Sequence, residues 1–506
     1  MFEDVPSGAP GETLLVVTSD IHGRLAEDPA RGRLGAAKLS GLLKRLRGEA
    51  GQVHLADCGD MFSGHAFASF DNGRTVAKAL GRLGFEALTL GNHDFDFGLE
   101  EGDPLYHLNT LVPILTEAAG GRSPAVLGLS MGLRGGGALP GVVTKAFSLG
   151  ELPGGGRLLA VGVPNPHTAR RSLRECLAGI DFGLESTLEE TRRKVLGNLA
   201  KEAAKIKGND VLVVLSHLGH EGGAEGSVAG PELTTAPGVS AVVDGHGHLP
   251  YELRLPDRAA YLNCGEGLEA IAIIRLSKGK SCSSKLWRYE QLAGEAPDPE
   301  IEALVSDLSE KMGLGEKVAE LPMAFGGGSE RDLGLPPAGP LVCRALLAAS
   351  KADLVLLNEG AVREGLSGVV TFGDVLECLP FRDSLFQCLM EGSEIASLAA
   401  WLAEGGSFPL GAGFSVLAYG NNAGGYGVEA VLGEDGAPLK PNRRYKLAAS
   451  GQMMRRLGPF NPLARHECRN LGLVERVFSD GLKKLTKSQL EAAANASLTA
   501  PLVWLG

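Results

Sequence analysis

An apolar run, Ala87-Leu88-Thr89-Leu90, leads directly into the polar stretch Gly91-Asn92-His93-Asp94-Phe95-Asp96. The run predicts a buried strand, so the polar residues fall in the loop that leaves its end. A turn uses Asn and Asp freely but does not need the histidine. A catalytic metal site needs all of these groups: an amide oxygen as ligand, an imidazole to meet charge on a substrate, and a carboxylate to orient the imidazole. The other ligands of such a site must come from elsewhere in the chain.

Four further apolar runs end in the same kinds of residue. Their polar ends read Ser19-Asp20-Ile21-His22-Gly23, Asp57-Cys58-Gly59-Asp60, Ser216-His217 and Asp244-Gly245-His246-Gly247-His248. In extended geometry the D-x-H and H-x-H pairs would each point two side chains the same way, because the side-chain period of a strand is 2. A carboxylate at Asp60 could bridge two cations. Each motif alone could be an ordinary turn, but together the five strand ends carry seven ligand-type residues: Asp20, His22, Asp60, Asn92, His217, His246 and His248.

Segments of helical pattern separate these strands. Leucines at positions 39, 42, 43 and 46 recur at helical spacing, and Ser186-Thr187-Leu188-Glu189 is a capping-box pattern that opens another helix. Strands that alternate with helices indicate an α/β layered domain. Such domains bind ligands at the carboxyl ends of their strands, which is where the seven residues fall.

The composition limits the classes of function. A chain of 506 residues predicts two or three domains. The net charge of −11 argues against nucleic acid as a partner. No window approaches the ~20 apolar residues of a membrane helix, so no membrane partner is expected. The eight cysteines form no C-x-x-C pair, which argues against a zinc knuckle or a disulfide framework. Cys58 is expected to be a small buried apolar residue.

The first residues, Met1-Phe2-Glu3-Asp4-Val5, contain neither a basic region nor an apolar region of the kind that a signal peptide requires. We therefore expect no signal peptide in this sequence. The compartment stays open: cytoplasmic for the chain as written, periplasmic or extracellular for a chain that has been trimmed.

The motif series D-x-H-G, G-D, G-N-H-[DE]-x-D, S-H and G-H-x-H resembles that of the calcineurin-like dinuclear metallophosphoesterases. The chain past residue 320 resembles the 5′-nucleotidase family, which includes bacterial UDP-sugar hydrolases and 2′,3′-cyclic-nucleotide phosphodiesterases. The resemblance implies a four-layer α/β/β/α metallophosphoesterase sandwich, followed by a C-terminal α+β substrate-binding domain. It places the first domain at residues 1–290, a linker helix region at 291–325 and the second domain at 326–506. A helical pattern over residues 297–312 matches that linker.

Carried over to this sequence, the resemblance implies a centre of two metal ions. One ion would bind Asp20, His22, Asp60 and His248. The other would bind Asp60, Asn92, His217 and His246, with Asp60 as the bridge. His93 matches the catalytic histidine of the family and Asp96 its carboxylate partner, whereas Asp94 stands where the family has Glu and is given a supporting role. Ligands of this kind suit Zn, Mn, Fe or Co, and two such ions ~3.5–4 Å apart would share a hydroxide that attacks phosphorus.

The resemblance also implies substrate-binding residues in the second domain. Asn358-Glu359-Gly360-Ala361-Val362-Arg363 resembles the family segment N-G-G-G-I-R, in which the Asn and the Arg hold the substrate. Arg331 matches an earlier substrate arginine or is a surface residue, and Phe408 is either a base-stacking aromatic or a core residue. Pro380-Phe381-Arg382-Asp383 is interpreted as structural. The family segment G-G-D-G-Y is absent here: Ser450-Gly451-Gln452-Met453 stands in its region.

Three functions remain open at this point. The leading hypothesis is a metal-dependent phosphohydrolase of 5′-nucleotidase type that acts on a small phosphoester, with a nucleotide as the expected substrate. A second is a phosphodiesterase or pyrophosphohydrolase acting on cyclic nucleotides or nucleotide-sugars. A third, of a different class, is a catalytically silent binding protein, but the chain has lost neither a ligand nor His93. The oligomeric state is left open.

Overall fold

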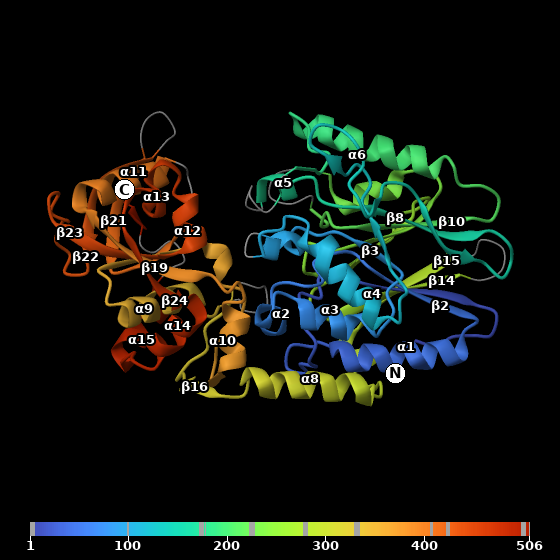
Figure 1. The fold of residues 1–506 in the computed structure, drawn as a ribbon, viewed down its shortest axis with the longest axis horizontal. Coiled ribbons are helices and arrows are strands. Elements are labelled where there is room, and N and C mark those ends of the chain that lie inside the picture. The colour runs from blue at the N-terminus through green and yellow to red at the C-terminus, as the bar shows by residue number, and fades with distance from the viewer. Residues whose placement is uncertain are drawn as a thin grey trace. The chain divides into compact units, whose positions relative to one another are not determined.

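The computed structural model describes residues 6–98, 101–171, 177, 179–221, 228–276, 282–327, 334–404, 408–420, 426–496 and 502–504. The chain divides into two compact units, Met1–Leu308 and Ser309–Gly506 (Figure 1). Each unit has its own sheets and its own buried core. They are taken in turn below.

The first unit contains two large sheets. A seven-stranded sheet has the order β15-β14-β1-β2-β3-β4-β6, and a six-stranded sheet has the order β12-β13-β11-β10-β8-β7. The strands of the first are β1 (Thr13–Thr18), β2 (Gln52–Asp57), β3 (Ala87–Thr89), β4 (Ala125–Leu127), β6 (Val142–Val143), β14 (Ala270–Leu276) and β15 (Cys282–Arg288). Those of the second are β7 (Phe147–Glu151), β8 (Arg157–Val163), β10 (Val211–Ser216), β11 (Val239–Asp244), β12 (Pro250–Leu253) and β13 (Ala260–Cys264).

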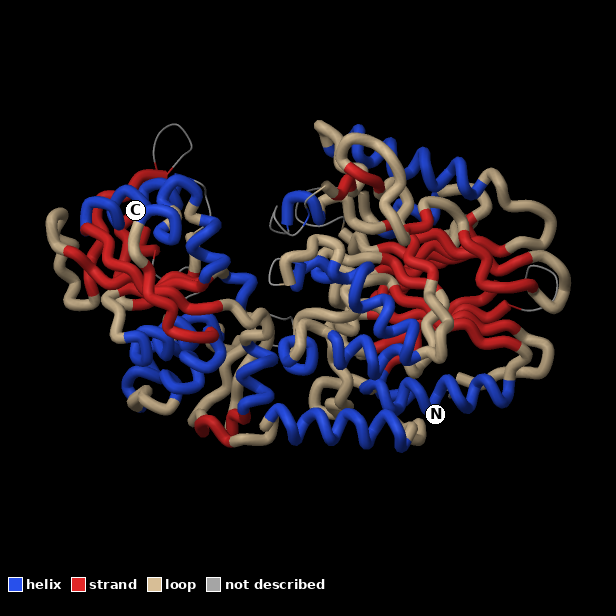
Figure 2. Tube along the Cα trace, viewed as in Figure 1, coloured by secondary structure: helices blue, strands red, loops and turns tan. Residues whose placement is uncertain are grey.

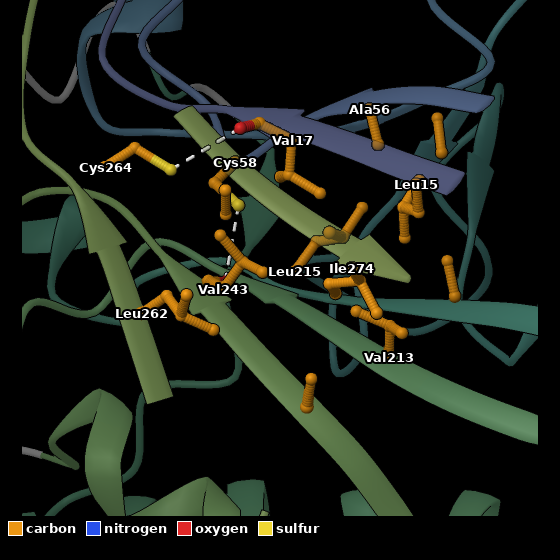
Figure 3. Close-up of a cluster of buried hydrophobic side chains, with 14 of the residues drawn as sticks. Leu15, Val17, Ala56, Cys58, Val213, Leu215, Val243, Leu262, Cys264 and Ile274 are labelled. Atoms are coloured by element: carbon orange, nitrogen blue, oxygen red, sulfur yellow. Dashed lines mark hydrogen bonds between the residues drawn. The ribbon is translucent and has the colours of Figure 1, made fainter. Parts of the chain in front are cut away.

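The two sheets share a buried core. Alternate residues of β1, such as Leu15 and Val17, cluster with Val213 and Leu215 of β10 (Figure 3). Cys58 and Cys264 lie in the same cluster, and the Cys58 thiol donates to the carbonyl of Val243 at 3.3 Å, as expected for a small buried residue. Residues of β1 and β10 that point the other way are also buried, because helices cover the outer faces. This is why these strands read as continuous apolar runs in the sequence.

Helices form the outer layers (Figure 2). The helices of the first unit are α1 (Gly35–Glu49), α2 (Ala66–Phe70), α3 (Arg74–Gly81), α4 (Val112–Ala118), α5 (Thr168–Arg171), α6 (Leu188–Ala203) and α7 (Tyr289–Leu292). Thr187 and Glu190 form the expected capping box of α6, and α6 packs Val195 and Leu199 against the six-stranded sheet. The predicted four-layer sandwich is confirmed. The predicted linker helix corresponds to α8 (Pro299–Met312), which begins in the first unit and ends in the second.

The second unit is built on a five-stranded sheet of order β20-β17-β23-β19-β24. Its strands are β17 (Leu354–Leu357), β19 (Ser384–Glu391), β20 (Leu410–Ala412), β23 (Arg444–Ser450) and β24 (Cys468–Leu473). Two smaller sheets contain β16 (Lys317–Glu320) with β18 (Val369–Thr371), and β21 (Phe414–Gly420) with β22 (Tyr426–Gly433) and β25 (Leu502–Trp504). The helices are α9 (Ala338–Ser350), α10 (Phe372–Cys378), α11 (Gly392–Glu404), α12 (Gly451–Arg456), α13 (Pro462–Arg465), α14 (Val474–Leu482) and α15 (Lys487–Ala494).

Topology brings four chain segments to one edge of this five-stranded sheet. β17 and β23 are parallel, so their carboxyl ends meet there. β19 is antiparallel to β23 and starts at the same edge, where Leu385 pairs with Ser450. β24 is antiparallel to β19 and ends there, so α14 begins at this edge too.

Candidate active site

The candidate metal ligands of the first unit leave the carboxyl ends of five parallel strands. Three of these strands, β1, β2 and β3, belong to the seven-stranded sheet, and β10 and β11 belong to the six-stranded sheet. Loops from two different sheets therefore supply one site. This matches the placement expected for ligands in α/β folds.

The expectation of extended D-x-H and H-x-H segments is wrong. Asp20 and His22 lie beyond β1 with φ of 48° and 52°, and His246 and His248 lie beyond β11 with φ of 67° and 52°. Asp60 has φ of 57°. Five of the eleven described non-glycine residues in the left-handed region are thus candidate ligands. Such backbone costs free energy and is held where the surroundings impose it, which is typical of functional sites.

Four of these side chains converge on one point. Nε2 of His248 lies 3.1 Å from Nε2 of His22 and 3.3 Å from Oδ1 of Asp20. Asp60 completes this group, in which one candidate ligand atom from each residue lies within 4.8 Å of the others. Two imidazole nitrogens that face each other and two carboxylates are the arrangement expected around a cation.

A second group shares Asp60 with the first. Asp60, His217 and His246 also bring one ligand atom each within 4.8 Å of one another. Nε2 of His217 lies 3.0 Å from Oδ2 of Asp60. Asn92, the fourth predicted ligand of this group, is buried at the start of the loop after β3. The preceding Gly91 packs so closely that a Cβ there would lie 2.1 Å from Oδ1 of Asp60.

Backbone carbonyls and carboxylates hold the imidazoles in orientation. Nδ1 of His22 lies 2.7 Å from the carbonyl of Ser63, and Nδ1 of His217 lies 2.8 Å from that of Cys58. Nδ1 of His248 instead faces Oε2 of Glu266 at 3.3 Å, and Oε1 of Glu266 accepts from Arg33 at 3.0 Å. Protons on these Nδ1 atoms leave each Nε2 free to bind a cation. Glu266 was not among the residues predicted for the site.

Burial and charge shift the pKa values of this cluster in opposite directions. Burial alone would raise the pKa of Asp60, but His217 and His93 hold it well below its usual range. Burial would lower the pKa of His217, yet Asp60 and Asp20 raise it to about 10. Burial and the neighbouring His248 lower the pKa of His22 to about 3. Ionised carboxylates and the neutral His22 are suited to binding a metal cation, whereas His217 must release its Nε2 proton to bind one.

His93 and Asp96 form the predicted dyad geometry on the loop after β3. Nδ1 of His93 lies 2.8 Å from Oδ2 of Asp96. Ser63 supports the pair, since its hydroxyl lies 2.8 Å from the carbonyl oxygen of His93 and 3.2 Å from Oδ2 of Asp96 and can donate to either. The His93 ring lies 5.5 Å from the His22 ring, measured between centroids. Sequence reasoning missed Ser63, which follows no recognised motif.

Asp94 fastens the loop after β3 to the loop after β2. Its carboxylate accepts from the backbone N–H groups of Gly91 at 2.8 Å, Asp60 at 3.0 Å and Met61 at 3.2 Å. Burial and the charge of Asp60 raise the pKa of Asp94 to about 7. The side chain of Asp94 is buried and holds the candidate ligand Asp60 in place. This contact is what its predicted supporting role consists of.

The residues present fit divalent metal ions. The donor set is entirely nitrogen and oxygen, with no thiolate among the clustered groups, and Asp60 belongs to both groups. The left-handed backbone holds five of the donors in place without any ion. His65 and His220, which stood near the motifs in sequence, belong to neither group.

The residues predicted to bind substrate lie in separate parts of the second unit. Asn358 follows β17, and the backbone N–H of Arg363 donates to the carbonyl of Cys378 at 2.9 Å. Phe408 packs against the hydrophobic core of this unit. Arg331 lies outside the described residues.

Asn358 lines a pocket at the sheet edge where β17 and β23 end. The other lining residues are Leu357, Ala361, Leu379, Phe381, Arg382, Asp383, Ser450, Gln452, Val474 and Glu475. Sequence reasoning missed Glu475 altogether, and it gave residues 380–383 only a structural role. A signal was present in the chain, because the segment at 450–453 departs from the family pattern at this place.

Two sequence profiles match the chain. The calcineurin-like phosphoesterase profile matches residues 13–250, and the profile of the 5′-nucleotidase C-terminal domain matches residues 323–459. The chain belongs to the 5′-nucleotidase family of calcineurin-like phosphoesterases. The resemblance drawn from the motifs is confirmed. Members of this family use divalent metal ions, in agreement with the clustered donors.

Individual relatives of the family are distant. The chain is 22% identical over 440 residues to the 5′-nucleotidase of Vibrio cholerae, which covers 75% of this chain and 73% of that protein. It is 25% identical over 406 residues to the endonuclease YhcR of Bacillus subtilis, covering 75% of this chain but 31% of that protein. The chain thus spans about a third of the endonuclease.

A solved structure shares the fold. The 5′-nucleotidase precursor of Thermus thermophilus superposes with a TM-score of 0.67 at 21% identity, covering 98% of this chain and 99% of that chain. At this identity the likeness establishes the fold. Among the described residues, no helix combines the length and the apolar character needed to cross a bilayer.

Proposed function

We propose that this protein is a metal-dependent hydrolase of nucleotide phosphate esters, acting in the manner of a 5′-nucleotidase. One observation carries the proposal: ligand-type side chains from four strand ends gather around the shared carboxylate of Asp60, beside the pair formed by His93 and Asp96. Family membership and the names of the relatives support the same reaction class.

We assign two divalent ions to the site, Zn, Mn, Fe or Co. The first would be held by Asp20, His22, Asp60 and His248, and the second by Asp60, Asn92, His217 and His246. When bound, such ions acidify water and offset the negative charge of a phosphoryl group. The shared Asp60 would fix the spacing of the two ions.

The chain's own residues supply the rest of the chemistry. His93 lies next to His22 at the rim of the cluster, so its Nε2 can meet an oxygen of the phosphoryl group. Asp96 fixes the proton of His93 on Nδ1 and stabilises the positive charge that the imidazole carries when it donates from Nε2. No side chain is required as a nucleophile, so no phosphorylated enzyme is expected.

The organic part of the substrate is assigned to the second unit, through Asn358 and Arg363. An arginine fork suits phosphate or carboxylate. A phosphodiesterase or pyrophosphohydrolase activity on cyclic nucleotides or nucleotide-sugars is the alternative, because the pocket beside Asn358 is lined by residues that depart from the family pattern.

The proposal is tested by loading the metal-free protein with each of the four metals and assaying p-nitrophenyl phosphate. A panel of nucleoside mono- and diphosphates, cyclic nucleotides, sugar phosphates and UDP-glucose then ranks the substrates. We expect turnover only with metal, and the highest kcat/KM for a nucleoside monophosphate. A protein that binds no metal and turns over no phosphoester would refute the assignment as an enzyme.

A further inference from the structure

The pocket at the edge of the five-stranded sheet contains a buried carboxylate that the proposed chemistry does not use. Glu475 is 3% exposed and lies at the start of α14, and its Oε2 atom has no hydrogen-bond partner among the described residues. Asn358 lines the same pocket, and its Oδ1 atom also has no hydrogen-bond partner in the part of the chain that the structure describes. Buried acceptors in this state cost free energy, which a ligand that donates to them recovers.

Two other polar groups of the pocket accept hydrogen bonds from the backbone. Oδ2 of Asp383 accepts from the backbone N–H of Gln452 at 2.7 Å, and the hydroxyl of Ser450 accepts from that of Met453 at 3.2 Å. Among the lining residues, the buried side-chain atoms without a hydrogen-bond partner in the described part of the chain are Oε2 of Glu475 and Oδ1 of Asn358, and both are acceptors.

Charge excludes a phosphate group from this pocket. The charged side chains that line it are Glu475, Asp383 and Arg382, so carboxylates outnumber the cation. Phe381 and the aliphatic wall of Leu357, Leu379 and Val474 suit the uncharged part of a ligand. The ligand that fits this pocket is an uncharged organic group with hydrogen-bond donors, and not an anion.

We propose that Glu475 determines which leaving group the protein accepts, by binding a hydrogen-bond donor of the nucleoside in this pocket together with Asn358. The inference rests on the proposed function, because it names the part of the substrate that the second unit selects. The donor is a base amine or a ribose hydroxyl, two sources of the same chemistry. Glu475 acts on binding and takes no part in the reaction at phosphorus.

The test uses nucleosides, which lack phosphate and so report on this pocket without hydrolysis. Binding to the full-length, metal-loaded protein is measured by calorimetry at pH 8 for three nucleosides. They are adenosine, purine riboside, which lacks the amine, and 2′,3′-dideoxyadenosine, which lacks the 2′- and 3′-hydroxyls. We expect adenosine to bind about 10-fold or more tightly than one of the two analogues, since a donor to a charged acceptor is lost. The analogue that binds more weakly than adenosine identifies which group of the nucleoside is the donor.

In Glu475→Gln, the affinity for adenosine and the affinity for the weaker analogue should lie within about 3-fold of each other, because a neutral amide replaces the carboxylate acceptor. Glu475→Leu provides a second variant of similar volume. The matched control is Asp480→Asn, which removes an exposed charge from the same helix. Turnover of p-nitrophenyl phosphate, which carries no such donor, should stay unchanged in the control variant Asp480→Asn.

Two results would overturn the inference. Wild-type protein could bind all three nucleosides equally, or Glu475→Gln and Glu475→Leu could keep the wild-type preference. Both outcomes leave the proposed function intact if nucleotides are hydrolysed. Failure of the proposed function looks different: p-nitrophenyl phosphate and nucleotides are then not hydrolysed at all, whatever residue stands at 475.

Discussion

At the scale of single residues, the loop after β3 divides its work among neighbours. Asp94 accepts from the backbone of the neighbouring loop, and Asp96 contacts the imidazole of His93. In the proposed mechanism Asn92 would bind a metal ion and His93 would meet the phosphoryl group. Adjacent polar residues point to different partners because the loop winds as a short 3₁₀ helix over His93–Gly98. The roles of these side chains can therefore be separated by substitution.

Replacing His93 by Gln should lower kcat about 100-fold or more while the metal content stays that of wild type, because His93 meets the phosphoryl group and binds no metal. Phosphate release and metal analysis of the same sample check this. Asp60→Asn is the contrasting variant, since Asp60 belongs to both ligand groups and its loss should reduce metal content and turnover together. Loss of metal in His93→Gln would contradict the division of roles.

At the scale of elements, the site depends on a close approach between two loops. A Cβ on Gly91 would lie 2.1 Å from Oδ1 and 2.6 Å from the backbone nitrogen of Asp60. A methyl group there must displace the shared carboxylate. The requirement for glycine is thus steric and belongs to the site.

Gly91→Ala should weaken metal binding about 10-fold or more, the range seen when the groups that hold ligands in place are lost. Gly197→Ala is the matched control: it lies within α6 with open space around its Cα, so it should bind metal normally and add about 0.5–1 kcal/mol of stability. Metal titration and thermal unfolding of both variants provide the measurements. Equal metal affinities in the two variants would refute the steric account.

The start of α14 gives the second unit a pH dependence. Burial raises the pKa of Glu475 from 4.5 to about 7, against the lowering effect of Arg382 and Arg476. A carboxyl whose folded pKa is raised binds a proton between pH 4.5 and 7 that the unfolded chain has released, so its contribution to stability falls as pH rises through this window. The full loss is about 3 kcal/mol.

Glu475→Gln removes this titration. The free energy of unfolding of the variant relative to wild type should therefore be about 3 kcal/mol higher at pH 8 than at pH 4.5. Urea unfolding of both proteins at the two pH values measures the difference. A constant offset between them would show that Glu475 titrates normally.

At the scale of the whole molecule, the clustering of six of the seven candidate ligands could be predicted, and the geometry between the loops could not. The ligands follow strongly apolar strands, and the carboxyl ends of such strands meet whatever the details of packing. The left-handed backbone of Asp20 and His248 was not predictable, because it is imposed by contacts between loops. The bond from Asp60 to Asp94 joins residues 34 apart and has no local pattern.

The pocket of the second unit shows the same limit more sharply. Antiparallel pairing of β19 with β23 and β24 gathers its residues from four separate segments. Glu475 follows an unremarkable strand and gives no motif, although its burial without a partner marks it in three dimensions. Sequence patterns identify functional residues whose partners lie nearby in the chain. They do not identify residues whose partners come from distant segments.

The central claim, that this protein hydrolyses nucleotide phosphate esters with metal ions bound at Asp60 and its neighbours, is tested most directly by one titration. Metal-free protein receives increasing Mn²⁺ while phosphate release from 5′-AMP is recorded. The account predicts background release without metal and a rise that saturates at two bound ions per chain. Full turnover by the metal-free protein, or no turnover at any loading with this or the other candidate metals, would contradict it.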